Sequence, residues 1–221
     1  MKTLITAHSG CDNTPDNSIE FVEYALGLDV DALEVDVRLR DSCLIMAHDV
    51  DSISSPLADA FAKLVAFPEK RLNCDLKEPG LEAQVLSLAK AKGVEKQLQY
   101  SGTVSFQWMR QNRGAVEWLC NIEALVPNIY SAGDIADKAS ARKLADMAIK
   151  AFHEGLASCF NMNYKIYDSY FCGCLLDEHI PLSLWTPSLE DEVHYFLRQG
   201  VYNITTRIAA TACELRRQLW N

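Results

Sequence analysis

The sequence has no hydrophobic run long enough to cross a membrane, although about half of its 221 residues are apolar. Its apolar opening over residues 1–7 turns polar at His8 and is too short for a secretory signal peptide. These two absences predict a protein without stable membrane insertion, and we expect it in the cytoplasm.

Basic residues are outnumbered, with 21 Lys and Arg against 30 Asp and Glu and a formal net charge of −9. A general nucleic-acid binder needs a basic surface, so this balance predicts that nucleic acid is not a partner. An acidic protein would also repel a phosphate ester. If the substrate is a phosphate ester, the charge balance therefore implies a bound cation.

Paired cysteine motifs are missing as well, although the chain has eight cysteines. Four of them lie in apolar, strand-like runs, where a free thiol behaves as a small hydrophobic group: Cys43, Cys74, Cys120 and Cys159. Cys172 and Cys174 form a C-x-C pair and not the C-x-x-C pattern of a zinc site. We therefore expect reduced cysteines and no disulfide framework.

No stretch rich in Pro, Gly or Ser divides the chain, which predicts a single domain over residues 1–221. Strand-like segments cover residues 4–7, 33–40, 72–76, 98–101, 116–122, 157–162, 181–186 and 202–205, and a short apolar arm covers 44–47. Helical spacing covers residues 17–28, 81–91, 104–111, 135–151, 167–178, 189–199 and 209–219.

This alternation reads as eight strand–helix units that end in a helix. It predicts parallel strands with right-handed crossovers, and eight units predict closure into a TIM (β/α)8 barrel of the α/β class. The alternative is an open doubly wound sheet. The barrel is favoured because no glycine-rich phosphate loop follows the first strand.

The second strand carries two carboxylates in the run Leu33-Glu34-Val35-Asp36-Val37. Side chains alternate along a strand, so Glu34 and Asp36 share one face and the three apolar residues share the other. The apolar face is expected to pack on helices. Both carboxylates are then expected to point towards the barrel axis.

The third strand repeats this pattern, because Asp75 and Lys77 share one face. Barrel interiors are usually filled with branched apolar side chains, and several inward-facing acids would repel one another and lose hydration. A divalent cation removes that cost. An all-oxygen set of ligands suits Mg²⁺ or Ca²⁺ better than zinc.

Two histidines follow strand-like segments at the same expected rim, His8 after the first strand and His48 after the apolar arm. Imidazole gives or takes a proton near neutral pH, so the pair can serve as acid and base beside a metal-bound phosphate. The sequence does not assign the two roles. The other histidines fall on predicted helices or helix ends and are expected to be structural: His153, His179 and His194.

Short motifs follow one another in a fixed order. The chain reads His8-Ser9-Gly10, then Pro15-Asp16-Asn17-Ser18, then Glu34-Val35-Asp36-Val37. It continues with His48-Asp49, Asp75-Leu76-Lys77-Glu78-Pro79 and, much later, Trp185-Thr186-Pro187. This set resembles the motifs of the glycerophosphodiester phosphodiesterase family, densely over roughly the first eighty residues and thinly beyond them.

The resemblance implies a TIM barrel that binds one Mg²⁺ or Ca²⁺ ion through Glu34, Asp36 and Asp75. It implies His8 and His48 as catalytic acid and base, and Lys77 as a contact of the phosphate. The implied substrates are small-molecule glycerophosphodiesters such as glycerophosphocholine, cleaved to glycerol 3-phosphate and an alcohol. Trp185 is expected to line the pocket beside the alcohol.

The chain departs from the family pattern at several positions. Ser9 stands where the family has an arginine, and a hydroxyl cannot replace the bidentate phosphate contacts of a guanidinium, so Ser9 is only a candidate substrate contact. Asp16 and Asp75 replace glutamates, and the segment around 49–72 is a reduced form of the longer insertion that the family carries over the site. Arg207, after the last strand, is a candidate for the missing positive charge.

The sequence thus favours a metal-dependent phosphodiester hydrolase. Two alternatives remain open: a phosphate-ligand binding protein derived from such an enzyme, and a related lyase that forms a cyclic phosphate from a phospholipid headgroup. Two retained histidines favour an enzyme, because binding alone needs no proton carriers. The sequence leaves the alcohol group, the identity of the ion and the oligomeric state open.

Overall fold

The computed structural model describes residues 2–52, 54–130 and 137–220. Its parallel strands are β1 (Leu4–Ala7), β2 (Ala32–Arg40), β5 (Arg71–Leu76), β6 (Leu98–Gly102), β7 (Glu117–Asn121), β8 (Cys159–Asn163), β9 (Leu182–Trp185) and β10 (Asn203–Thr206). Its α-helices are α1 (Ile19–Leu26), α2 (Leu57–Leu64), α3 (Glu82–Lys92), α4 (Phe106–Gln111), α5 (Lys138–Phe152), α6 (Tyr170–Asp177), α7 (Glu190–Gln199) and α8 (Ala209–Trp220).

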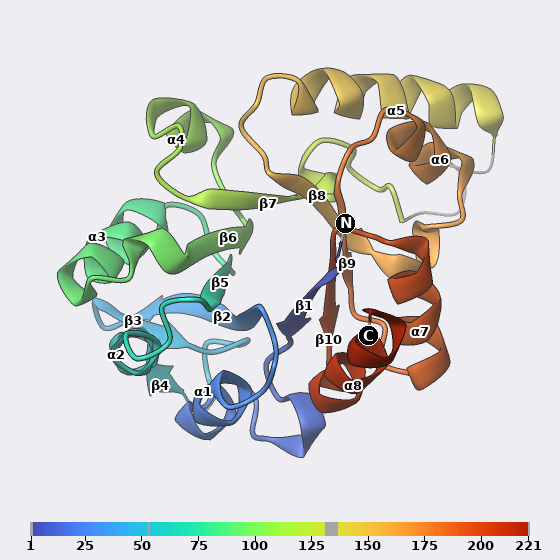
Figure 1. The fold of residues 1–221 in the computed structure, drawn as a ribbon. Coiled ribbons are helices and arrows are strands. Elements are labelled where there is room, and N and C mark those ends of the chain that lie inside the picture. The colour runs from blue at the N-terminus through green and yellow to red at the C-terminus, as the bar shows by residue number, and fades with distance from the viewer. Residues whose placement is uncertain (1, 53, 131–136, 221) are drawn as a thin grey trace.

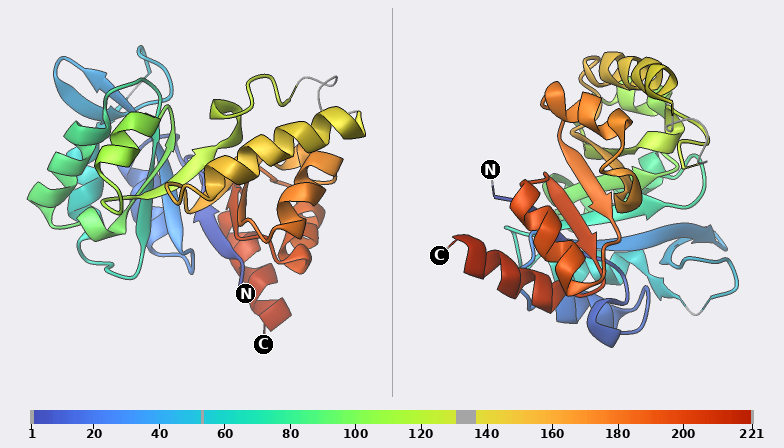
Figure 2. Two further views of the ribbon diagram at one scale, coloured as in Figure 1. Left: turned by 90° about the horizontal axis from the view of Figure 1, so that it is seen from above. Right: turned by 90° about the vertical axis from the view of Figure 1, so that its right-hand side faces the viewer.

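The eight parallel strands seen in this described part of the chain form a closed ring with the helices outside it (Figure 1). The order is β1-β10-β9-β8-β7-β6-β5-β2, and pairing of Thr6 with Ala32 and of Ala7 with Leu33 joins β1 to β2. Two short antiparallel strands, β3 (Cys43–Met46) and β4 (Ser55–Pro56), extend the sheet beyond β2. The hairpin of β2 and β3 projects from the barrel on the side away from the two termini (Figure 2). The predicted TIM barrel is confirmed.

Each predicted strand and helix coincides with an observed one to within a few residues, but the sequence analysis missed α2. The buried residues of α2 have the spacing of an amphipathic helix: Leu57, Ala60, Phe61 and Leu64. The helix has only eight residues and begins directly after Pro56, so its signal is short. It lies with β4 in the segment 49–72, which therefore contains the second crossover helix. The first two residues of the predicted helix 135–151 lie outside the described residues.

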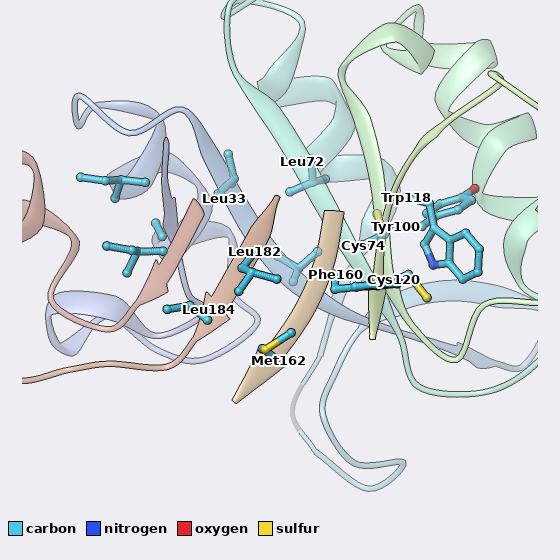
Figure 3. Packing of buried hydrophobic residues seen from close by; sticks show 14 of the residues in the cluster. Leu33, Leu72, Cys74, Tyr100, Trp118, Cys120, Phe160, Met162, Leu182 and Leu184 are labelled. Carbon is cyan, nitrogen blue, oxygen red and sulfur yellow. The ribbon is translucent and has the colours of Figure 1, made fainter. Parts of the chain in front are cut away.

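The outer faces of the strands form the hydrophobic core with the helices. Leu33, Val35 and Val37 of β2 are buried, as the alternation predicts. Figure 3 shows the same layer continuing across the neighbouring strands through Leu72, Tyr100 and Trp118. All eight cysteines are free thiols, and seven are buried. The expectation for Cys43 is wrong: it is exposed, because it opens the projecting strand β3.

The inner face of the barrel is polar. Side chains of neighbouring strands bond to one another around the ring: Thr6 to Asn203, Asn203 to Ser183, Ser183 to Asn161, and Asn73 to Ser101. Each of these residues is buried. Apolar side chains usually fill such interiors, so a polar one marks a place where the fold serves a ligand instead of packing.

The last helix fastens the first strand. Arg216 of α8 is a buried arginine that donates to the backbone oxygen of Thr3 and pairs with Asp31. Asp31 in turn accepts from the backbone N–H of Ile5 in β1 at 2.8 Å. Both termini lie at the end of the barrel where the strands begin (Figure 2). None of the helices in the described ranges is both long and apolar enough to span a bilayer.

Candidate metal and phosphodiester site

A pocket of about 420 Å³ opens at the carboxyl ends of the barrel strands, where TIM barrels carry their active sites. Seven of the eight predicted site residues line it: His8, Glu34, Asp36, His48, Asp75, Lys77 and Trp185. Ser9 is the exception. The pocket lies within the size range of small-molecule sites.

Three carboxylates lie close together on one side of the pocket. Glu34, Asp36 and Asp75 each offer an oxygen, and these oxygens lie within 4.8 Å of one another. Strand register explains the grouping, because Asp36 of β2 lies directly opposite Asp75 of β5. Burial, and then the negative charges of Asp36 and Asp75, raise the pKa of Glu34 well above its usual range. Hard oxygen donors of this number and spacing fit Mg²⁺ or Ca²⁺.

Lys77 lies among these carboxylates. Its Nζ is 2.7 Å from Asp36 Oδ1 and also pairs with Asp75. Burial disfavours the charge on Lys77, but the two carboxylates outweigh burial and raise the pKa of the ammonium. Lys77 is therefore a fixed positive charge on the carboxylate side of the pocket.

Asn17 orients Asp36 through hydrogen bonds, and the absence of a side chain at Gly102 leaves room for Asp75. The Asn17 side chain donates to Asp36 Oδ2 at 2.8 Å and accepts from the Asp36 backbone N–H at 2.9 Å. Gly102 has a positive φ of 77°, and a Cβ there would stand 2.4 Å from Asp75 Oδ1. The motif around Asn17 is visible in the sequence, but only the fold shows that its side chain orients a carboxylate.

His8 is half-buried beside the carboxylates, with Nε2 3.9 Å from Glu34 Oε2. Its Nδ1 is 2.7 Å from the backbone oxygen of Ser9. That oxygen only accepts, so Nδ1 carries the hydrogen and Nε2 of the neutral ring is free to accept a proton. Burial, and to a smaller extent the charge of Arg207, lower the pKa of His8. The ring is therefore neutral at neutral pH.

His48 occupies the exposed rim. Its Nδ1 is 3.2 Å from Asp49 Oδ1, and both side chains are largely in solvent. The backbone oxygen of His48 accepts from Arg38 Nε at 2.7 Å, which ties the loop to β2. The two histidines therefore line one pocket in different surroundings.

Ser9 lies outside the described lining of the pocket. It is buried, and its hydroxyl accepts from the Asn17 backbone N–H at 2.6 Å. Its own N–H points to Glu34 Oε2 at 3.3 Å. The structure thus places Ser9 beneath the site, where it supports the loop that carries Asn17.

Arg207 is the second basic side chain of the pocket, after Lys77. It lies in the loop after β10, so strand alternation in the sequence does not predict where its side chain points. Its Nη1 is 3.0 Å from Asp16 Oδ1, and both residues line the pocket. The pair lies over Gly10, where a Cβ would stand 2.0 Å from Asp16 Oδ1 and 3.0 Å from Arg207 Nη1. Glycine at residue 10 therefore leaves room for a guanidinium near His8.

The opposite side of the pocket carries no basic residue of those described. It contains amides, one further acid and an aromatic ring: Asn121, Asn161, Glu123 and Trp185. The acid follows β7 in a single 3₁₀ turn, Ile122–Ala124, so no strand alternation announces it in the sequence. The remaining histidines do not line this pocket.

No protein-family model matches the chain. A curated glycerophosphodiester phosphodiesterase of Caldanaerobacter subterraneus subsp. tengcongensis is 35% identical to it over 80 residues. That match covers 35% of this chain and 33% of the relative, so the similar stretch spans about a third of the relative's length.

Solved structures match over the full length. A glycerophosphodiester phosphodiesterase from Parabacteroides distasonis superposes with a TM-score of 0.72 and 15% identity, covering 100% of this chain and 99% of that one. An Oleispira antarctica phosphodiesterase, solved with the product sn-glycerol-3-phosphate, matches with a TM-score of 0.69 and 13% identity over 96% of both chains. The resemblance read from the sequence motifs is thereby confirmed: the chain is similar to glycerophosphodiester phosphodiesterases in the sequence of one stretch and in the fold of its whole length.

Proposed function

We propose that this protein is a metal-dependent phosphodiester hydrolase that acts on glycerophosphodiesters and releases glycerol 3-phosphate and an alcohol. The observation that carries the proposal is the meeting of three close carboxylates, one ammonium and two histidines in a single pocket. A pocket that only bound phosphate would gain nothing from two imidazoles able to move protons.

Glu34, Asp36 and Asp75 would hold one Mg²⁺ or Ca²⁺ ion. When bound, the ion supplies charge neutralisation for the phosphate oxygens. Lys77 adds a second positive charge on that side of the phosphate, and Arg207 adds a third from the loop after β10. Of these three charges, Arg207 would replace the arginine that Ser9 does not supply.

His8 is the proton acceptor in this proposal, because its free Nε2 faces the pocket and its ring is neutral. It takes a proton from water as the water oxygen attacks phosphorus. The bond from phosphorus to the alcohol oxygen breaks, and His48 at the open rim gives that oxygen a proton. One water is consumed, and the two histidines exchange protonation states before the next turnover.

The proposal is tested by turnover of bis(p-nitrophenyl) phosphate and of glycerophosphodiesters with Mg²⁺, with Ca²⁺ and with a chelator. We expect metal-dependent release of glycerol 3-phosphate, detected by phosphorus NMR. His8→Ala is expected to lower the rate by about 100-fold or more. The matched variant His153→Ala changes an exposed histidine outside the pocket and should retain full activity.

Other outcomes support the alternatives. A cyclic phosphate as the stable product would identify a lyase, in which a hydroxyl of the substrate replaces water as the nucleophile. Binding of glycerol 3-phosphate without any metal-dependent turnover would identify a binding protein. Equal rates for His8→Ala and the parent protein would exclude His8 as the proton acceptor.

A further inference from the structure

The strand β2 carries charged side chains on one face along most of its length. Side chains alternate along a strand, so Arg38 and Arg40 continue the face that begins with Glu34 and Asp36. Both arginines are half-buried, whereas Leu39 between them is 36% exposed. Hydrophobic burial would give the opposite pattern. The guanidinium groups are therefore covered because they bond to a part of the chain that lies over this face.

That part of the chain is the loop between β3 and β4. Arg38 Nε donates to the backbone oxygen of His48 at 2.7 Å. Arg40 donates to three further groups of the loop: the backbone oxygen of Val50, that of Ser52 at 3.1 Å and the hydroxyl of Ser54 at 3.1 Å. A guanidinium presents its N–H donors in a rigid planar fork, so one side chain can hold several groups at once. The two arginines thus fasten the loop at every second residue from 48 to 54.

The ring of His48 is poorly fixed by its own contacts. Its side chain is 66% exposed, and Asp49, whose Oδ1 is 3.2 Å from Nδ1, is 76% exposed. An ion pair between exposed groups contributes little. The place of His48 in the pocket therefore depends on its backbone. The backbone N–H of Ala47 donates to the Asp36 backbone oxygen at 3.0 Å, and Arg38 binds the carbonyl of His48 itself.

This backbone support matters for proton transfer. An acid must lie within hydrogen-bond reach of the oxygen that it protonates. A displacement of about 1 Å can lower a rate by about 100-fold. Neither Arg38 nor Arg40 belongs to the described lining of the pocket, so the two side chains can act on the reaction only through the loop.

We infer that Arg38 and Arg40 are positioning residues that hold His48 where it protonates the leaving alcohol. The inference rests on the proposed hydrolase function, in which His48 is the acid. The bond from phosphorus to the alcohol oxygen breaks, the oxygen keeps the electron pair, and the proton of His48 joins it. One face of β2 then serves the reaction twice: its buried part carries two of the metal-binding candidates, and its projecting part sets the acid.

A matched pair of substrates tests the inference. Glycerophosphocholine releases an alcohol that is a strong base without its proton, whereas the p-nitrophenyl ester of glycerol 3-phosphate releases a phenolate that needs no proton. Arg40→Met keeps a long unbranched side chain and removes the donors. We expect kcat to fall about 10- to 100-fold for glycerophosphocholine and about twofold or less for the p-nitrophenyl ester. Arg38→Met should show the same split. Arg198→Met changes an exposed arginine outside the pocket and should leave both rates unchanged.

Two further measurements show whether the effect passes through the histidine. His48→Ala should give the same split between the two esters. Arg40→Met added to His48→Ala should lower the rate no further, because both changes remove one function. The affinity for Mg²⁺ or Ca²⁺, measured by calorimetry, should be the same in Arg40→Met as in the parent protein.

The outcomes separate this inference from the proposed function. Equal losses on the two esters, a parallel loss of metal affinity, or a further loss in the double variant would assign the arginines to the support of β2. Each of these results overturns the inference and leaves the hydrolase standing. If the parent protein cleaves neither ester, the proposed function fails, and NMR order parameters of the backbone at residues 48–52 decide. Lower values in Arg40→Met support the hold on His48, and unchanged values overturn it.

Discussion

The two sides of the pocket hold their polar groups in opposite ways. On the carboxylate side, Glu34, Asp36 and Asp75 of β2 and β5 bring three like charges together. The amide side is defined by Asn121, Asn161 and Ser183 of β7, β8 and β9. There Ser183 donates to Asn161 and Asn161 donates to Asn121, each at 2.9 Å. In a neutral network of this kind the polar groups find hydrogen-bond partners among themselves, because every member both donates and accepts.

The carboxylate side has no such internal balance. Lys77 compensates Asp36 and Asp75, but the raised pKa of Glu34 shows that the protein alone does not stabilise all three negative charges. The difference indicates that the carboxylate side could hold a cation, whereas the amide side is stabilised by its own hydrogen bonds. Changes on the first side should therefore affect metal binding, and changes on the second should affect stability.

The largest expected effect comes from crowding the carboxylate side. In Gly102→Ala the new methyl group would meet Asp75 Oδ1 and the backbone of Leu76, so the carboxylate and the end of β5 must move. We expect Mg²⁺ or Ca²⁺ affinity, measured by calorimetry, to fall on the order of 10- to 100-fold. Gly80→Ala is the control, since residue 80 has a similar positive φ of 86° but open space at the Cβ position. Equal losses in both variants would attribute the effect to backbone strain and not to Asp75.

An intermediate effect is expected on the amide side. Asn161→Ala removes a donor to Asn121 Oδ1 and the acceptor of the Ser183 hydroxyl at the centre of the network. We expect the free energy of unfolding in urea to fall by about 2 kcal/mol, with little change in metal affinity. Gln107→Ala, which removes an exposed amide, should change it by less than about 0.5 kcal/mol. A large loss of metal affinity in Asn161→Ala would break the distinction between the two sides.

The smallest effect is a dependence of thermal stability on pH and cation. The pKa of Glu34 is raised from 4.5, so in the metal-free protein its contribution to stability is fully present at acid pH and is lost as the pH rises through the raised pKa. A bound cation removes that loss but must displace the proton. Saturating Mg²⁺ or Ca²⁺ should therefore raise Tm by about 5–10 °C at pH 8 and by less at pH 5.

The control for this measurement is NaCl at matched ionic strength, which screens exposed charges without occupying the site. An increase in Tm that is the same at both pH values would contradict a proton on Glu34. In Glu34→Gln the pH dependence of the cation effect should disappear.

The sequence was sufficient for the barrel and for the residues carried by strands. Period-two alternation places Glu34 and Asp36 inward in any strand pairing, and closure of parallel strands brings them to Asp75. Loop residues were harder to predict. The roles of Arg207, Asn17 and Glu123 depend on where a turn directs the backbone, which no periodic pattern records. The eight-residue helix α2 was missed for a related reason, because two turns give little periodicity to detect.

The position of β1 between β2 and β10 has a consequence for how the barrel forms during synthesis. The neighbours of Leu4 to Ala7 include Asn203 to Thr206, nearly two hundred residues away in the chain, and Arg216 fastens the same strand from the final helix. A nascent chain lacks one wall of the ring until β10 and α8 have emerged from the ribosome. Closure of the ring therefore waits for β10, and proteolytic removal of α8 should loosen β1, the strand that His8 follows directly.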